Sequence, residues 1–384
     1  MNLMAPPASP RATAHDPAAG IVGLLDGMAA LVPDWQANAA ALDAEAAFPV
    51  GELRDLHAIG GYLAPLPARL GGLGLGSEAS GARGLLELLR LIGRGNLAVG
   101  RVFEGHVNAL KLMTQYGAER QLEQAARDAA AGHLFAIWNT EPAEGLRLVG
   151  APPNAVLRGR KIFCSAAGHA TRALVTARAA DGEARMLLVA LRPGERMGDE
   201  TWRLQGMRAC RTGSMVFDGM AVTETALIGQ PGDYLRQPEF SAGAWRTSAV
   251  TLGGLEALVG EATRQLVERR RQDNPHQKAR MGEAMIARET ALLWLRKAAA
   301  VAEGGRAAPG DVAGYVNLAR IAVETACLDA MRAVQRSLGL AGLLASNPVE
   351  RMLRDLATYL RQPAPDETLD EAATWFMQRA LPDA

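Results

Sequence analysis

The sequence predicts a mainly helical protein in which a β domain is inserted between an N-terminal helical domain and a C-terminal four-helix bundle. Three observations support this order. Hydrophobic residues make up 49% of the chain but aromatic residues only 5%, and much of the apolar content is Ala and Leu, which are strong helix formers. Apolar residues recur at helical spacing over residues 20–132 and again in 233–384. Residues 133–232 instead hold short runs rich in Val, Ile and Phe, which Gly and Pro separate.

The N-terminal part begins with a segment that we expect to be disordered. Residues 1–19 are rich in Pro and Ala and contain no apolar signal-peptide core. Residues 20–132 then alternate helical patterns with breaks. The first helix is expected to break at Pro33, and the Pro and Gly content of 64–76 excludes a continuous helix there. Gly117 is placed as the C-terminal stop of a later helix.

The middle and C-terminal parts contain specific local signals. Asp181-Gly182 lies between two apolar runs, which predicts a hairpin within an antiparallel β domain over residues 133–232. In the C-terminal part, Asn347 precedes Pro348 and Glu350, the pattern of a capping box at a helix start. Bundle helices are expected at about 278–303, 311–338, 347–361 and 367–379, after a first helix whose buried face includes Thr251, Leu255, Leu258, Ala262 and Leu266.

Charge and cysteine usage exclude several function classes. The 384 residues carry 41 basic and 41 acidic side chains, so there is no electrostatic case for binding nucleic acid or an anionic membrane surface. No stretch approaches the roughly 20 uncharged apolar residues that a membrane span needs. The three cysteines, Cys164, Cys210 and Cys327, are too far apart for a CxxC metal site. We therefore expect reduced thiols, a cytoplasmic protein and no metal.

One short motif suggests a nucleotide site that its context does not support. Residues 74–79 match the pattern GxGxxA of dinucleotide-binding domains, with Glu87 further on. That motif works where a buried strand leads into a helix N-terminus, within a βαβ unit. The preceding segment is rich in Pro and Gly and is no parallel strand. A loop between helices is the favoured interpretation.

Seven short phrases resemble a known family in both wording and order. They are FP at 48–49, PARLGGLGL at 67–75, WNTEP at 138–142, LRGRKIF at 157–163, LIG at 227–229, QRSLGLAG at 335–342, and PVER with RD at 348–355. Together they resemble the acyl-CoA dehydrogenase superfamily of flavoproteins over about residues 20–362. The resemblance implies FAD as cofactor and an acyl thioester or a related small molecule as substrate. It also implies a homotetramer or dimer, and an electron-transfer flavoprotein or a flavin reductase as partner.

The resemblance implies where the flavin ring would lie. In the family, the strand before Thr-Glu-Pro runs along the ring, and here it comprises residues 137–140, with Ile137, Trp138 and Thr140 as contacts. The aromatic-x-Ser pattern that covers the ring is Phe163 with Ser165. A planar redox-active ring needs stacking area and a few fixed hydrogen-bond donors, which these residues can supply. The alternative for Phe163 is a plain core residue of a strand.

A second cofactor contact would come from a neighbouring subunit. The family's Arg-x-x-Phe-Gly motif is best matched by the region of Arg269 and Arg270, but no Phe-Gly follows. A pyrophosphate contact by one of these arginines and a solvated basic helix end remain equal alternatives. Gln335 and Gly339 keep the family's later Gln-x-x-x-Gly pattern, which implies a contact with the adenosine part.

The catalytic base of the family is missing from both of its usual positions. Dehydrogenation requires a carboxylate that removes the α-proton of the thioester beside the flavin. In most members this Glu follows the Arg-Asp pair, where this chain has Pro363. In other members it directly precedes an Arg of the first bundle helix, where Trp245 precedes Arg246. Ordinary acyl-CoA dehydrogenation is therefore in doubt.

Three functions remain open. One is oxidation of an acyl thioester by hydride transfer to flavin N5, with a displaced base. A second is flavin-dependent monooxygenation, because a branch of the superfamily lacks the Glu and carries Pro after Arg-Asp. A third is a degenerate, non-catalytic paralogue. His106 is the best-placed catalytic residue, although a structural role is the alternative; Glu239 is a weaker base, and His169 is expected in a loop.

Overall fold

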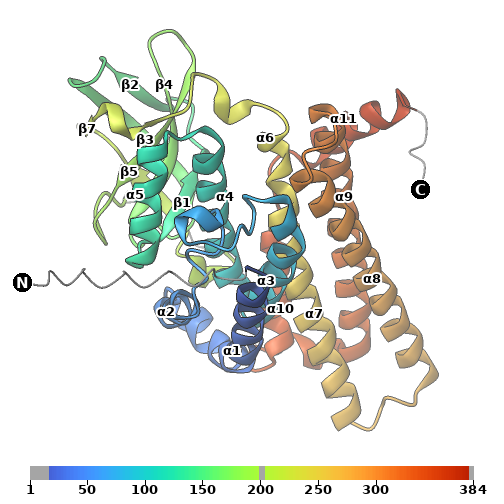
Figure 1. The fold of residues 1–384 in the computed structure, drawn as a ribbon. Coiled ribbons are helices and arrows are strands. Elements are labelled where there is room, and N and C mark those ends of the chain that lie inside the picture. The colour runs from blue at the N-terminus through green and yellow to red at the C-terminus, as the bar shows by residue number, and fades with distance from the viewer. Residues whose placement is uncertain (1–16, 199–203, 380–384) are drawn as a thin grey trace, which may run out of the picture.

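A computed structural model describes residues 17–198 and 204–379, and its fold is mainly helical with a central sheet domain, as predicted (Figure 1). The N-terminal region contains five α-helices among the described residues: α1 (Pro17–Glu45), α2 (Val50–Ala58), α3 (Ala82–Gly95), α4 (Leu97–Tyr116) and α5 (Glu119–Ala130). The motif at 74–79 lies in the turn-rich segment before α3, with Gly74 and Gly76 at positive φ. This placement supports its interpretation as a loop.

Helix α1 differs from the prediction at both its start and its middle. It begins at Pro17, so residues 17–19 of the expected disordered arm are helical, and residues 1–16 lie outside the described range. It also continues through Pro33, where a break was predicted. A proline removes one backbone hydrogen bond, but burial of one face against the core, through Met28, Val32 and Trp35, holds the helix together.

The same helix has a second notable property. Among the described residues, Ala18–Glu45 is the one segment long and apolar enough to cross a membrane, with a mean hydropathy of 1.3 over its window. Length and composition cannot separate a membrane span from a core helix. The contacts of α1 with α3, and burial of Leu24 and Ala39, show it packed against the protein core in this structure.

The middle region forms a mixed sheet rather than the antiparallel one predicted. The strands are β1 (Phe135–Trp138), β2 (Leu146–Val149), β3 (Ala155–Cys164), β4 (Arg172–Arg178), β5 (Ala184–Ala190), β6 (Gly213–Val216), β7 (Met220–Val222) and β8 (Leu227–Ile228). Their order is β6-β3-β2-β4-β5-β8, and β7 pairs with β3. Strand β1 pairs in parallel with β4, because the intervening β2–β3 hairpin lets the chain cross over before β4.

One local prediction is confirmed in full and a second in part. Strands β4 and β5 form the hairpin around Asp181-Gly182, with Gly182 at φ +84°. The Asn347 side chain caps a helix by accepting a hydrogen bond from the backbone N–H of Val349 at 3.0 Å. Glu350 forms an ion pair with Arg354 instead of reaching back to the cap, so only half of the capping box is present.

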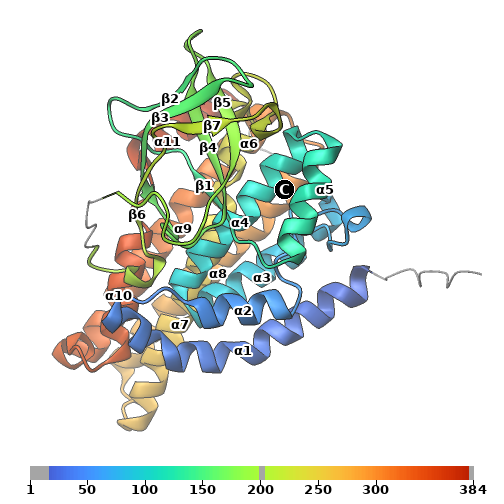
Figure 2. The same ribbon diagram turned by 90° about the vertical axis from the view of Figure 1, so that its left-hand side faces the viewer.

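The C-terminal region contains α6 (Glu239–Ala242), α7 (Ala244–Glu268), α8 (Pro275–Glu303), α9 (Pro309–Leu338), α10 (Pro348–Tyr359) and α11 (Pro365–Met377). Helices α7, α8, α9 and α10 form the bundle, and α11 packs on α9 (Figure 1). Helix α3 crosses α7 closely, since a Cβ on Gly253 would lie 2.1 Å from the carbonyl oxygen of Arg90. Both views place the sheet at the α6 end, away from the α7–α8 connection (Figure 2).

Candidate functional site

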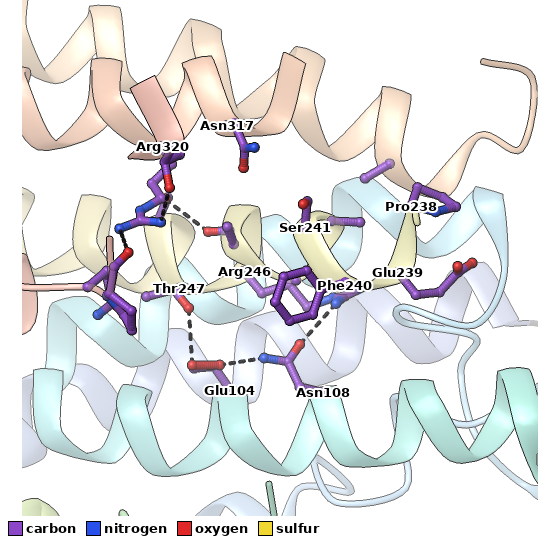
Figure 3. Close-up of a pocket in the computed structure, with 18 of the residues that line it drawn as sticks. Glu104, Asn108, Pro238, Glu239, Phe240, Ser241, Arg246, Thr247, Asn317 and Arg320 are labelled. Carbon is purple, nitrogen blue, oxygen red and sulfur yellow. Dashed lines mark hydrogen bonds between the residues drawn. The ribbon is translucent and has the colours of Figure 1, made fainter. Parts of the chain in front are cut away.

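Two adjoining cavities lie where the sheet meets the helices. The first, which we call the groove, has a volume of about 600 Å³ and runs past the ends of β1, β3 and β4. The second, which we call the inner cavity, has a volume of about 430 Å³ and lies between α4, α6, α7, α9 and the start of α11 (Figure 3). Both volumes are in the range of small-molecule sites. Five residues line both cavities and form the junction between them: Arg101, Ile137, Tyr234, Phe240 and Pro363.

A bulge in β3 turns an aromatic ring into the groove. The pairing of β3 with β6 shifts register between Lys161 and Cys164, and Phe163 adopts a left-handed φ of +53°. A bulge of this kind re-aims a side chain relative to the pleat. Phe163 is consequently 46% exposed and lines the groove, while Cys164 is buried. The core alternative for Phe163 does not hold, and the ring can stack on a planar ligand.

A buried lysine fixes the chain segment just beyond β1. The Lys161 ammonium donates to the Asn139 carbonyl at 2.9 Å and to the Thr176 hydroxyl at 3.0 Å, and it forms an ion pair with Glu141. The Thr176 hydroxyl in turn donates to the Asn139 side-chain oxygen at 2.6 Å. Burial lowers the pKa of Lys161, although Glu141 opposes the shift. The exposed residues Asn139 and Thr140 are therefore presented to the groove from a rigid base.

The sequence pattern around Lys161 served only to locate Phe163 and did not predict this network.

The predicted flavin strand at 137–140 is shorter than expected, because β1 ends at Trp138. Trp138 is only 3% exposed, and its indole N–H donates to the Ser165 carbonyl at 3.0 Å. The Thr140 carbonyl accepts from the Ile162 N–H at 2.9 Å. Trp138 lines the groove, whereas Ser165 lies beside Trp138 and does not line the groove.

The remaining predicted cofactor residues lie at the other end of the bundle. Arg269, Gln335 and Gly339 are exposed near the α7–α8 connection and the end of α9. Along α7, 21 residues separate Arg269 from Ser248, the last residue of this helix that lines the inner cavity, which corresponds to about 31 Å. The Arg269 guanidinium donates to the Gln265 side chain of its own helix at 3.0 Å. These residues cannot reach a ligand in the groove of the same chain, so their predicted role requires a second subunit.

His106 does not lie in either cavity. Its side chain is fully buried, its Nε2 lies 2.9 Å from the Tyr62 carbonyl oxygen, and its Nδ1 accepts from the Phe135 N–H at 3.1 Å. Burial lowers the pKa of His106 to about 4, so the ring is neutral at pH 7. Both ring nitrogens are engaged in joining α4 to β1 and to the segment after α2. This corrects the predicted catalytic role to a structural one.

The structure places Glu239 and His169, the two other candidate residues, in different surroundings. Glu239 lines the inner cavity, where one carboxylate oxygen accepts from the Tyr116 hydroxyl at 3.3 Å. His169 lies in the turn after β3, as expected, and stacks on Phe48 with 3.9 Å between ring centroids. His169 lines neither of the two cavities.

A buried carboxylate holds the far wall of the inner cavity. The Glu303 side chain is only 1% exposed and forms ion pairs with Arg246 and, at 2.9 Å, with Lys111. Trp245 donates its indole N–H to Glu303 at 3.2 Å. Burial alone would raise the pKa of Glu303, but the two adjacent cations hold it below its usual value. Glu303 is therefore ionised and saturated with donors.

A second buried carboxylate continues this network along α4. Arg246 donates to the Asn108 side-chain oxygen at 2.9 Å, and Asn108 donates to Glu104 at 2.7 Å (Figure 3). Glu104 also forms an ion pair with Arg101 and accepts from the Thr247 hydroxyl at 3.1 Å. Its Oε1 accepts from Arg101 and Thr247 and its Oε2 from Asn108, so both oxygens are hydrogen-bonded within the protein. Sequence reasoning did not find Glu104, because its partners come from distant parts of the chain.

The junction between the cavities has no proton acceptor. Among the described residues that line both cavities, none is a carboxylate or a histidine. Burial raises the pKa of Tyr234 to about 12, so its hydroxyl remains a donor at neutral pH. Arg101 is a fixed cation beside Glu104. The junction can therefore donate hydrogen bonds and exclude water with Ile137, Phe240 and Pro363, but it cannot abstract a proton.

Comparison with known proteins identifies relatives of this chain. Residues 247–361 match the family model "Acyl-CoA dehydrogenase, C-terminal domain". The mitochondrial very long-chain specific acyl-CoA dehydrogenase of Rattus norvegicus is 28% identical over 232 residues, 55% of this chain and 35% of that protein. The chain thus spans about a third of that relative. The amino sugar nitrososynthase DnmZ of Streptomyces peucetius is 27% identical over 362 residues, 87% of each chain.

A solved structure shows the same fold over nearly the whole chain. FMN-bound TdsC from Paenibacillus sp. A11-2 superposes with a TM-score of 0.81 at 20% sequence identity. The match covers 94% of this chain and 98% of that one. At this level of identity the likeness concerns the fold alone.

The structural role of His106 predicts a specific pH dependence. Between its ordinary pKa of 6.5 and about 4, the unfolded chain binds a proton at this position that the folded chain does not. Folding stability should therefore fall by up to about 3 kcal/mol as the pH drops through this window. In His106→Gln, thermal melts should show a lower midpoint at pH 7 and a flatter pH dependence. The exposed His276→Gln serves as the control and should match the wild type. Lost turnover with an unchanged melting midpoint would contradict the structural role.

Proposed function

We propose that this chain, which belongs to the acyl-CoA dehydrogenase superfamily, is a flavin-dependent monooxygenase that uses reduced flavin and oxygen on a small molecule. Members of this family are flavin-dependent enzymes, so both enzymatic alternatives are oxidoreductases of the acyl-CoA dehydrogenase fold. The choice of monooxygenation over dehydrogenation depends on one observation. The junction between the groove and the inner cavity contains no base.

The position of the missing base is what decides between the two reactions. A thioester oxidised by the flavin must place its α-carbon between the ring and a free carboxylate. A ring stacked on Phe163 would meet an occupant of the inner cavity at the junction, where Pro363 stands. Glu104 lies close by, but Arg101, Thr247 and Asn108 already use its oxygens. Oxygen transfer from reduced flavin needs no such carboxylate, and Ile137, Phe240 and Pro363 give the junction apolar walls that would help to exclude water.

The groove supports a flavin ring in this orientation. Phe163 offers an exposed aromatic face, and Asn139 and Thr140 offer polar groups that the Lys161 network holds in place. When bound, reduced flavin supplies the two electrons with which oxygen yields one oxygen atom on the substrate and one molecule of water. Tyr234 would donate a hydrogen bond at the junction, and Ile137 would help to exclude water. A flavin reductase is the partner that this reaction requires.

Dehydrogenation of an acyl thioester is the second candidate. Its specific support is Glu239, which lines the inner cavity with the Tyr116 hydroxyl as its one hydrogen-bonding partner among the described residues. A displaced base there would have to act from outside the junction. The relative DnmZ, a nitrososynthase aligned over 87% of both chains, favours the first candidate over this one.

The two candidates separate in a single series of measurements. We expect the purified, flavin-loaded protein to remain oxidised under anaerobic butyryl-, octanoyl- and palmitoyl-CoA, because no base meets the substrate beside the ring. With a reductase that supplies reduced FMN under ¹⁸O₂, we expect label to enter an organic product, for which indole is the first compound to test. Bleaching of the flavin by any of the thioesters would overturn monooxygenation in favour of dehydrogenation.

The stacking role of Phe163 can be tested by flavin affinity. Phe163→Ala should raise the Kd for FMN about tenfold, since loss of one aromatic stack corresponds to roughly 1.4 kcal/mol. Titration followed by quenching of flavin fluorescence measures this. Phe376→Ala is the matched control, because Phe376 is a similarly exposed phenylalanine on α11 that does not line the groove. Equal affinity in both variants would remove Phe163 from the flavin site.

The predicted homo-oligomer, a dimer or tetramer, remains a proposal that exposed apolar residues support. Ile286 on α8 is 70% exposed and Leu340 after α9 is 79% exposed, near the end of the bundle that carries Arg269. FAD would need Arg269, Gln335 and Gly339 from a second subunit, whereas FMN needs the groove alone. Light scattering should give a mass that is a multiple of 40.6 kDa, and Leu340→Lys should reduce it. A monomeric wild type would contradict the proposal.

A further inference from the structure

Arg320 is a cation of the inner cavity whose charge the protein does not neutralise. Its guanidinium donates to the Pro363 carbonyl at 2.7 Å and to the Thr368 hydroxyl at 3.1 Å, and both acceptors are neutral (Figure 3). Its Nε is buried and has no hydrogen-bonding partner. No carboxylate among the described residues forms an ion pair with the Arg320 guanidinium within 4.0 Å. The neighbouring Glu324 pairs with Arg361.

The other cations of the inner cavity are different. Arg101 is paired with Glu104, whereas Arg246 and Lys111 share Glu303. A buried charge costs free energy unless a counter-charge compensates it. Burial lowers the pKa of Arg320, which reflects this cost, while Glu324 only partly opposes the shift. The three other cations thus share two carboxylates, whereas Arg320 has no ion-pair partner among the described residues.

A second polar side chain of the inner cavity lies one turn before Arg320 on α9. Asn317 is buried and lines the inner cavity, and its amide makes no hydrogen bond to any residue that the structure describes. Figure 3 shows Asn317 and Arg320 reaching from α9 into the same space, with Ser241 of α6 opposite. The Ser241 oxygen accepts from Gln237 at 2.8 Å, which leaves its own proton to donate. Three donors therefore converge from two helices.

Three further carboxylates line the inner cavity besides the paired Glu104. Glu239 sits at the start of α6, whereas Glu367 and Glu371 belong to α11 and flank Thr368, which contacts Arg320. Glu367 and Glu371 are exposed to solvent, and water and salt screen exposed charges strongly. These two carboxylates therefore oppose an anion at Arg320 less than a buried carboxylate would.

We infer that the inner cavity binds an anionic group of the substrate at Arg320, with Asn317 and Ser241 as further donors. The substrate class is a small molecule that carries a carboxylate or a phosphate. This inference deepens the proposed function, and it adds a specificity site in the cavity that adjoins the flavin groove. A guanidinium suits such a group because it presents several N–H donors in one plane, which can meet two oxygens of one anion.

The alternative is that Arg320 only fastens the segment between α10 and α11. In that role Arg320 contacts only two neutral acceptors, so a neutral hydrogen-bond donor would serve as well as a charged one. Fastening does not involve the Asn317 amide, whereas an anion in the cavity would accept a hydrogen bond from it. The two accounts predict different effects of charge on ligand binding.

Isothermal titration of the flavin-loaded protein distinguishes them, without oxygen or reductant. The probes are indole-3-acetate and indole-3-acetamide, which share a shape and differ in charge, and phenyl phosphate. The wild type should bind an anion at least tenfold more tightly than the amide. Preference for indole-3-acetate would identify a carboxylate substrate, and preference for phenyl phosphate a phosphate ester. Arg320→Gln should weaken anion binding at least tenfold and leave amide binding within twofold.

Two further variants keep the test decisive. Asn317→Asp places a negative charge beside Arg320 without removing its contacts to Pro363 and Thr368, so it should weaken anion binding tenfold even if Arg320→Gln fails to fold. Arg332→Gln is the matched control, because Arg332 is an exposed arginine of the same helix paired with Asp329. Equal affinity of the wild type for acid and amide, or no binding of either anion, would overturn the inference. The readout does not involve flavin chemistry, so a dehydrogenase outcome above would leave it standing.

Discussion

The structure of the site depends on the requirement that charges removed from water be paired. Glu303 at the end of α8 binds Arg246 of α7 and Lys111 of α4, and Arg246 continues through Asn108 to Glu104. The contacts of Glu303 with Arg246 and Lys111, and that of Arg246 with Asn108, join helices that are distant in sequence. The network therefore ties the N-terminal helices to the bundle along the wall of the inner cavity. Removing Glu303 would leave the buried Arg246 without an ion-pair partner among the described residues.

The same requirement operates on the sheet side of the site. Lys161 is buried beneath the groove, and its three acceptors all belong to the ends of β1 and β4 or to the segment just beyond β1. Its neutralisation by Glu141 fixes the edge along which a flavin ring would lie. The junction is thus enclosed by two satisfied networks and is itself lined by groups that neither accept nor release a proton at neutral pH. Its chemistry is set as much by that inertness as by any reactive side chain.

The sequence predicted what local interactions determine and failed where distant partners decide. The Asp181-Gly182 hairpin and the Asn347 cap depend on neighbouring residues, and both are present. Pro33 was expected to end a helix, but long-range packing of α1 overrides a local break. The structural role of His106 was hidden because its acceptor and donor, at Tyr62 and Phe135, come from other elements. Family phrases located Phe163, yet only the bulge explains its exposure.

The absence of a catalytic carboxylate is built into this site and is not a simple loss. Trp245 stands where some relatives carry a base, and its indole N–H lies 3.2 Å from a Glu303 oxygen. A carboxylate in its place would face Glu303 across the same gap and repel it, which would disturb the pairing of Arg246 and Lys111. The buried charge network is therefore compatible with Trp245 and would not tolerate a carboxylate at the same position.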